Sequence, residues 1–407
     1  MIYRPVRKKE IRMLEAKKLF DKIEEKEQEY IRFWRDLCEI ESPTYYKEGI
    51  DAVADLIIEK ASHYGMQVDR HHFERAGDTC TITLNPEAKK KPICLSAHMD
   101  TVFKQGAFSS PRTRIEGDTI YGPGVTDDKG GLAAALYTMA VLAECGFKDR
   151  PVKLIMQCDE ENSSIATGLQ SIDYMYEQAK NCLCFFNLEW YRYGQAILWR
   201  KGSFTMLVKV YGKTYVSKRC FLGHSALAQA CFMICELEKY KQPDGLCCNV
   251  GYIKAGEYGD TEMNVPDYCE FAFDLSYMTA QEYESVIKQI NDMCSNPIIE
   301  GTRCEYELKG GFPNMEKRKD NFELLEKMNR IYRELGMKQL EATWSHGGSD
   351  ASRMNQKGIT TIDSLGVHGL YIHTLDEQAD ISSLKDAARR LSTVIAYIED
   401  RHDSDYQ

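Results

Sequence analysis

The chain has 407 residues, of which 43% are hydrophobic and 28% are charged, and its formal net charge is −10. This length exceeds one ordinary domain and predicts two hydrophobic cores, while the composition excludes a disordered or membrane-embedded chain. The acidic balance disfavours a nucleic-acid partner, because phosphate contacts need a basic surface.

The N-terminus and the cysteines indicate a cytoplasmic protein. Met1 to Glu10 is basic and lacks the apolar core of a signal peptide. No apolar run approaches the ~20 residues that span a bilayer, so we expect no membrane partner. The 15 cysteines are scattered and lie mostly in apolar runs. Without paired CxxC spacing, we expect them to be reduced core residues.

The first half of the chain alternates helices and strands. Apolar residues repeat every three or four positions from Glu15 to about Ile40 and from Gly49 to His63, which predicts two amphipathic helices. Four strands and one further helix are expected at Thr79 to Leu84, Ile93 to Ala97, Gly131 to Cys145 (the helix), Val152 to Cys158 and Leu183 to Phe186. This alternation predicts an α/β sheet covered on both faces.

The pattern changes near Gly202. Alternating strands and helices of a small α+β unit are expected at Phe204 to Tyr211 (strand), Ala226 to Tyr240 (helix), Tyr268 to Tyr277 (strand), Gln281 to Cys294 (helix) and Thr302 to Leu308 (strand). The α/β style resumes after Lys309 with Asn321 to Gly336 (helix), Ile359 to Leu365 (strand) and Ile381 to Asp400 (helix). We therefore predict a main domain of residues 1–203 and 309–407, with a second domain inserted at 204–308.

A histidine and an aspartate end the second predicted strand. His98 and Asp100 follow the strand from Ile93 to Ala97, and their two-residue spacing places both side chains on one face. His98 is a candidate metal ligand, and Asp100 a candidate carboxylate that orients it. For this pair alone, a polar strand end without a metal is the alternative.

Two adjacent carboxylates follow a Gly-Pro-Gly turn. Asp127 and Asp128 precede the helix of small residues, and aspartate is favoured at a helix N-terminus. One carboxylate would suffice for capping. The pair therefore leaves one carboxylate free to bridge two cations.

Glu160 and Glu161 follow the strand from Val152 to Cys158. Taken alone, consecutive carboxylates indicate a solvated loop. Adjacent residues at a strand end point in different directions, however, so one glutamate can bind a metal while the other acts as a general base.

Convergence favours a metal site over these separate alternatives. Four candidates each follow a predicted strand: His98, Asp127, Glu161 and Glu189. Open α/β sheets place their sites at the carboxyl ends of strands. With His373 near the C-terminus, these nitrogen and oxygen ligands suit two zinc-like ions that share a carboxylate.

The order of these motifs resembles the zinc-dependent exopeptidase and aminoacylase family that includes glutamate carboxypeptidase, acetylornithine deacetylase and succinyl-diaminopimelate desuccinylase. The resemblance spans nearly the whole chain from about residue 15. Its matching segments are Ser96 to Asp100, Gly122 to Gly131, Asp159 to Asn162, the Glu189 segment, Gly347 to Ala351 and His373 to Glu377. It implies an α/β fold, with a mixed-sheet catalytic domain of the dizinc peptidase type and an inserted α+β, ferredoxin-like lid domain. Lids of this family often mediate dimers.

The resemblance also implies a ligand set for two divalent metal ions, expected to be Zn²⁺. His98 and Glu189 would hold one ion. Glu161 and His373 would hold the other, and Asp127 would bridge the two.

Further roles follow from the same resemblance. Glu160 would be the general base, and Asp100 would orient a metal ligand. Substrate contacts would come from Asn264, Gly348 and Ser349.

Two positions in the implied lid depart from the family pattern. Val216 stands where a Gly-x-x-x-His segment has its histidine, which helps to bind substrate and stabilise the tetrahedral intermediate. Ser276 stands where the family often has an arginine. His224 could replace the missing histidine, or could be a surface residue.

The leading hypothesis is a cytoplasmic metal-dependent hydrolase that cleaves an amide bond of a small peptide or N-acyl amino acid, with a possible homodimer through the lid. One alternative is a catalytically impaired homologue that binds metal and a ligand or partner. Another is a hydrolase for substrates that lack a free carboxylate, which would explain Ser276.

Overall fold

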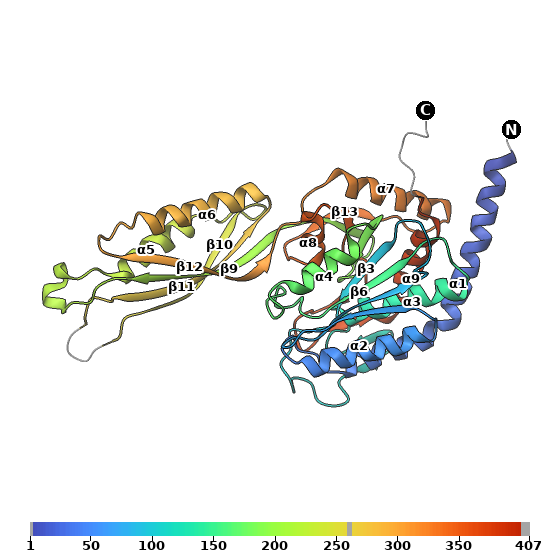
Figure 1. The fold of residues 1–407 in the computed structure, drawn as a ribbon, viewed down its shortest axis with the longest axis horizontal. Coiled ribbons are helices and arrows are strands. Elements are labelled where there is room, and N and C mark those ends of the chain that lie inside the picture. The colour runs from blue at the N-terminus through green and yellow to red at the C-terminus, as the bar shows by residue number, and fades with distance from the viewer. Residues whose placement is uncertain (1–2, 259–262, 400–407) are drawn as a thin grey trace. The chain divides into compact units, whose positions relative to one another are not determined.

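The chain divides into two compact units in the computed structural model, which describes residues 3–258 and 263–399, with side chains from residue 13 onward. The first unit contains the described parts of Met1–Leu198, Lys317–Trp344 and Ser349–Gln407. The second contains those of Trp199–Glu316 and Ser345–Gly348. Figure 1 shows both units as ribbons.

A mixed six-stranded sheet forms the centre of the first unit. Its strands, in spatial order, are β1 (Gln67–His71), β2 (Thr79–Leu84), β6 (Val152–Gln157), β3 (Ile93–His98), β7 (Cys184–Asn187) and β14 (Thr361–Ile362). The first two pairings are antiparallel, and those joining β6, β3, β7 and β14 are parallel. All six residues of β3 are buried, as expected for a strand inside a covered sheet.

Helices cover this sheet. They are α1 (Tyr3–Glu39), α2 (Lys47–Ser62), α3 (Lys129–Glu144), α4 (Gln170–Ala179), α7 (Lys319–Glu334), α8 (Asp350–Gln356) and α9 (Ile381–Tyr397). Buried side chains of α4 and α8 pack against Cys94, Ile155 and Phe185 of the sheet. α3 contacts β3 and packs beside α1 and α9, as Figure 1 shows. Across the described residues, no helix is both long enough and apolar enough to cross a membrane.

A second, four-stranded sheet in this unit consists of very short strands. Its order is β15 (Gly369–Leu370), β16 (Gln378–Asp380), β5 (Thr119–Tyr121) and β4 (Arg114–Glu116). β5 and β16 are antiparallel, with Tyr121 opposite Gln378. The turn that leaves β5 and the segment that enters β16 therefore lie at the same end of the pair.

The second unit has a ferredoxin-like fold. Its elements along the chain are β9 (Gly202–Tyr211), η1 (Ser217–Leu222), α5 (Ala226–Leu237), β10 (Cys247–Ala255), β11 (Tyr268–Tyr277), α6 (Ala280–Ser295) and β12 (Arg303–Phe312). The antiparallel sheet has the order β10, β11, β9, β12, which with its two helices gives the β-α-β-β-α-β arrangement. Both helices pack on the same face of this sheet (Figure 1), over a buried apolar cluster that includes Val208, Phe271 and Ile290. A further two-stranded sheet, most of whose residues belong to the first unit, pairs β8 (Gln195–Arg200) with β13 (Glu341–Ser345).

Candidate metal centre

Four candidate residues lie where parallel strands of the central sheet end. His98 is the last residue of β3, and β6 and β7 flank β3 in parallel. Glu160 and Glu161 follow β6, and Glu189 follows β7. Because parallel strands end at the same edge of a sheet, these side chains are brought to one place.

The remaining two candidate ligands come from the short-stranded sheet. Asp127 lies in the turn between β5 and α3, and His373 lies in the connection between β15 and β16. Glu377 joins these two segments, because its carboxylate accepts hydrogen bonds from the backbone N–H groups of Thr126 at 2.8 Å, Asp127 at 3.1 Å and Gly124 at 3.1 Å. Burial and the charge of Asp127 raise the pKa of the Glu377 carboxyl to about 8, although these three backbone hydrogen bonds act to lower it. They hold the turn in position beside His373.

The two carboxylate oxygens of Asp127 face different groups of side chains. Oδ1 lies 2.9 Å from His98 Nε2, which is 3.9 Å from Glu189 Oε1. Oδ2 lies 2.9 Å from His373 Nε2, which is 3.4 Å from Glu161 Oε2. Two groups of potential ligand atoms result, and they share Asp127. One comes from His98, Asp127 and Glu189 and the other from Asp127, Glu161 and His373, and within each group the atoms lie within 4.8 Å of one another.

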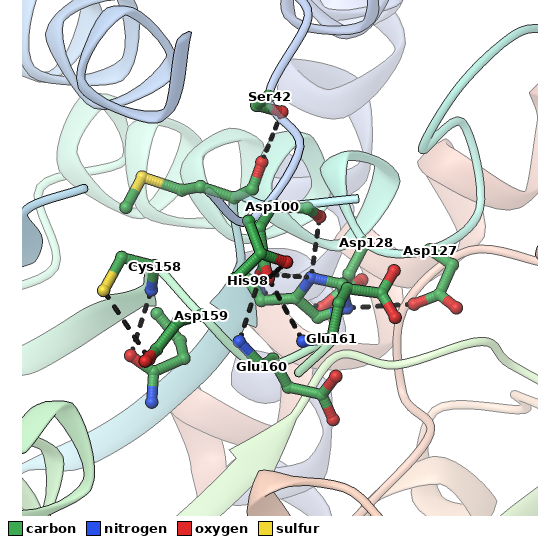
Figure 2. Close-up of polar contacts among 12 residues, drawn as sticks. Ser42, His98, Asp100, Asp127, Asp128, Cys158, Asp159, Glu160 and Glu161 are labelled. Carbon is green, nitrogen blue, oxygen red and sulfur yellow. Dashed lines mark hydrogen bonds and ion pairs between the residues drawn. The ribbon is translucent and has the colours of Figure 1, made fainter. Parts of the chain in front are cut away.

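Asp100 supports both the histidine and the glutamate pair. Its carboxylate accepts hydrogen bonds from the backbone N–H groups of Glu160 and Glu161, at 3.2 and 3.1 Å, and from the Thr44 hydroxyl at 2.7 Å. Nδ1 of His98 is hydrogen-bonded to the Asp100 backbone carbonyl at 3.0 Å and lies 3.3 Å from the Asp100 carboxylate, while the other ring nitrogen faces Asp127. Figure 2 shows the Asp100 carboxylate between the histidine ring and the two glutamate amides. Such a contact fixes the orientation of a ligand ring.

Glu160 differs from its neighbours in having a free carboxylate. Its side chain is buried, and among the described residues its carboxylate oxygens make no hydrogen bond or ion pair. In Figure 2 this carboxylate points away from the hydrogen-bonded network. It is therefore available for proton transfer.

Asp128 packs against α3 without capping it. Its side chain makes no capping hydrogen bond to α3, and Oδ2 instead accepts from the backbone N–H of His98 at 3.3 Å. Gly131 makes this packing possible, since a Cβ there would lie 2.2 Å from Asp128 Oδ1 and 2.5 Å from the Leu188 carbonyl. The small-residue start of α3 thus permits the close approach of the segment after β7 that carries Glu189.

The acidic groups of the centre perturb one another. Burial, together with the charge of Glu189, raises the pKa of Glu160 well above its usual value. Burial and the neighbouring Asp127 raise the pKa of Glu161 to about 7. Hydrogen bonds to Asp127 and Glu161 raise the pKa of His373 to about 10. Burial acts to lower the pKa of His98, but its contacts with Asp100 and Asp127 outweigh burial and raise that pKa well above its usual value, so both imidazoles bring positive charge to the buried carboxylates.

This set of side chains fits two divalent cations. Imidazole nitrogens and carboxylate oxygens are typical ligands of zinc and similar metals, and buried carboxylates need positive charge nearby. The opposed oxygens of Asp127 suit a shared ligand, with His98 and Glu189 on one side and Glu161 and His373 on the other.

The residues expected to contact substrate lie in different surroundings. Asn264 is exposed in the connection between β10 and β11, within the second unit. Gly348, also in that unit, packs so closely on Phe312 that a Cβ would lie 2.2 Å from it. Ser349 is buried in the first unit and donates its hydroxyl to Asp363 at 2.6 Å. That bond supports a structural use of the Ser349 hydroxyl.

The two unusual positions both lie in the second unit. Val216 immediately precedes η1 and is 44% exposed. Ser276 lies within β11, opposite Ser203 of β9 and Cys247 of β10. His224 follows η1, and its backbone pairs with Lys213.

Two supporting acids were not singled out from the sequence. Glu377 holds the Asp127 turn, and Asp159 accepts hydrogen bonds from the Thr167 amide at 2.8 Å and the Ser171 hydroxyl at 2.7 Å. Asp159 is fully buried and Glu160 is 7% exposed, so this segment is not a solvated loop. Both acids belong to sequence segments that match the family pattern. Their place in those segments was the feature by which the sequence could have identified them.

Comparison with known families and sequences agrees with this geometry. The family model described as peptidase family M20/M25/M40 matches residues 94–397. Carboxypeptidase G2 of Pseudomonas sp. (strain RS-16) is 26% identical over 374 residues, covering 90% of this chain and 88% of that protein. Succinyl-diaminopimelate desuccinylase of Corynebacterium glutamicum is 22% identical over 322 residues, covering 75% and 80%.

Solved structures share the fold. A tripeptidase from Staphylococcus aureus has a TM-score of 0.74 at 21% identity, covering 91% of this chain and 98% of that one. The YXEP protein of Bacillus subtilis, described as a dinuclear metal binding peptidase, has a TM-score of 0.68 at 14% identity with the same coverage.

Proposed function

The chain belongs to peptidase family M20/M25/M40, and we propose that it is a two-metal hydrolase that cleaves an amide bond of a small peptide or N-acyl amino acid. One observation carries the proposal: each carboxylate oxygen of Asp127 faces a separate group of ligand atoms. A carboxylate with that placement can bridge two cations, whereas a purely structural aspartate has no need of two such groups.

The metal ligands in this proposal are His98 and Glu189 for one ion, Glu161 and His373 for the other, and Asp127 for both. We propose zinc as the metal, because the set combines imidazole and carboxylate ligands. When bound, such ions lower the pKa of a water molecule and polarise a carbonyl group.

Glu160 is the proposed general base. It would take a proton from the attacking water and deliver it to the leaving nitrogen as the amide bond breaks. Its free, buried carboxylate suits both steps. Asp100 would act by orienting His98 and by holding the Glu160 backbone.

Substrates without a free carboxylate are included in the proposal. Ser276 offers no cation that could clamp a substrate carboxylate, and Val216 offers no imidazole for an oxyanion. Removing one oxyanion donor costs about 10²–10³ in turnover where it has been measured. We therefore infer that uncharged amides belong in the substrate panel beside dipeptides and N-acyl amino acids.

The central test is Glu160→Gln in the metal-loaded protein. This change keeps the size of the side chain but removes the base, so turnover on a substrate identified from the panel should fall by about 10²–10⁴. Metal content, measured by elemental analysis, should remain that of the parent protein.

Three results would count against the proposal. Parental turnover in Glu160→Gln would show that the base is wrongly assigned. Loss of metal in that variant would make Glu160 a ligand. A parent protein that binds metal but hydrolyses no amide in the panel would favour a catalytically impaired homologue.

We further propose a cytoplasmic protein that forms a homodimer through the second unit. β10 is an edge strand of that unit, and an edge strand can pair with its copy about a twofold axis. The molar mass in solution, measured by light scattering, tests this: a monomer at micromolar concentration would contradict it.

A further inference from the structure

A cavity in the first unit is lined by none of the proposed metal ligands. Its volume is about 380 Å³, within the usual range for small-molecule sites. It is lined by α1, the segment after β7, the segment after α7, and α9, through Phe20, Tyr191, Tyr193, Gly194, Gly336, Met337, Lys338, Asp386, Arg389 and Arg390.

Aromatic rings and a buried guanidinium form part of the wall. Tyr191 is 4% exposed, and the Arg390 guanidinium stacks over its ring at 3.6 Å. Nη2 of Arg390 donates to the carbonyls of Leu365 and Gly366, which fixes its position. Phe20 lies on the α1 side, 5.5 Å beneath the Arg389 guanidinium. A ligand with an apolar body can pack against these rings.

The charged groups at the cavity have both signs. Lys338, Arg389 and Arg390 bring three positive charges to it, although the chain as a whole has a net charge of −10. Arg389 is paired with Glu24. In the described part of the chain, Lys338 and Asp386 make no hydrogen bond or ion pair.

Gly194 leaves space beside the lysine. A Cβ at this position would lie 3.2 Å from Lys338 Nζ, so the ammonium lies against the segment after β7, which also lines the cavity. An unpaired ammonium and an unpaired carboxylate, both on exposed side chains, thus border one cavity that Phe20, Tyr191 and Tyr193 also line. A ligand that satisfies both must carry an anion, a cation and an apolar part.

We propose that this cavity is a second binding site, separate from the metal centre, for a free amino acid with an apolar side chain. Lys338, supported by the neighbouring arginines, binds the α-carboxylate. Asp386 binds the α-ammonium, and the side chain packs against Tyr191 and Phe20. This assignment does not depend on the proposed hydrolytic activity, because it concerns binding alone.

L-Phenylalanine is a suitable probe, because its ring matches the aromatic wall. We expect saturable binding to the full-length protein by calorimetry or equilibrium dialysis. Lys338→Ala and Asp386→Ala should each weaken it at least about tenfold, the usual effect of losing a hydrogen bond to a charged group. Met337→Trp should abolish binding by filling the cavity. Lys148→Ala is the matched control, since this exposed lysine lies elsewhere in the same unit.

Two analogues test the charge assignment. N-Acetyl-L-phenylalanine lacks the ammonium and L-phenylalaninamide lacks the carboxylate, so both should bind more weakly than the free amino acid. Measuring them in the Glu160→Gln background avoids turnover. The proposal is overturned if L-phenylalanine does not bind to the parent protein, or if it binds to Lys338→Ala and Asp386→Ala as tightly as to the parent. It is also overturned if either analogue binds to the protein as tightly as L-phenylalanine.

Discussion

Asp127 owes its position to residues far from it in the sequence. Glu377, about 250 residues away, accepts hydrogen bonds from its turn. The sequence predicted the candidate ligands because each follows a strand or lies in a matching segment. It did not single out Glu377, because bonds from a side chain to distant backbone amides leave no periodic pattern in the sequence.

At this scale, the shared position of Asp127 predicts different metal contents for two variants. Asp127→Ala removes a ligand from both groups and should leave the protein with little metal. His373→Ala removes a ligand from one group only and should reduce metal content by about half. Elemental analysis after dialysis against metal-free buffer distinguishes the two, with Glu160→Gln as the variant that keeps its metal. Equal metal loss from Asp127→Ala and His373→Ala would mean that Asp127 is not shared.

Length determined which elements could be read from the sequence. β2, β11 and most helices have enough residues to show an apolar period, and the strands predicted at Thr79 to Leu84 and Tyr268 to Tyr277 match these two strands. The short strands β5, β15 and β16 have two or three residues and show no period, although they position Asp127 and His373. The strand expected from Ile359 to Leu365 contains only Thr361–Ile362. The last helix ends at Tyr397, and its predicted end, Asp400, lies outside the described residues.

At the scale of elements, the buried Asp78, which lies between β1 and β2, links α2 to β1 through its side chain. Asp78 accepts from Lys47 at 2.6 Å and from Arg70 at 2.7 Å, with its side chain 2% exposed. Burial alone would raise its pKa, but the bonds to Lys47 and Arg70 outweigh it and lower the pKa below its usual value. Because the folded state has the lower pKa, the stabilisation is present above the unfolded pKa of ~3.9 and is lost as pH falls through the folded value.

The corresponding prediction concerns Asp78→Asn. At pH 7 the free energy of unfolding should fall by about 3 kcal/mol, as when one partner of a buried ion pair is removed. The difference from the parent should shrink as the pH falls below about 4 towards the lowered pKa of folded Asp78, where the folded parent also loses this charge. Urea unfolding at several pH values measures both. Asp55→Asn removes an exposed partner of the same Arg70 and should cost at most about 1 kcal/mol. A pH-independent loss in Asp78→Asn would rule out the charge as its cause.

At the scale of the molecule, the chemistry is concentrated in one unit. All five proposed metal ligands and Glu160 belong to the first unit, while Val216 and Ser276 belong to the second. The change in pattern near Gly202 predicted an insertion, because an alternating strand with one exposed face differs from the buried strands before it. The order of strands within each sheet could not be read in the same way, since pairing between distant strands depends on packing rather than on local periodicity.

The first unit should therefore depend on metal for its stability. A ligand that binds only the folded state stabilises it by about 3 kcal/mol when its free concentration is a hundred times Kd. Removing the metal with a chelator should accordingly lower the melting temperature of the parent protein by several degrees. Adding metal back to the buried carboxylates should restore the original melting temperature. The effect should be larger at pH 8 than at pH 6, because protons compete with metal for the same ligands. Differential scanning calorimetry with and without chelator measures this, and Asp127→Ala should respond little because it has little metal to lose. If the chelator leaves the melting temperature of the metal-loaded parent protein unchanged, the first unit does not need cations beside these carboxylates to stay folded.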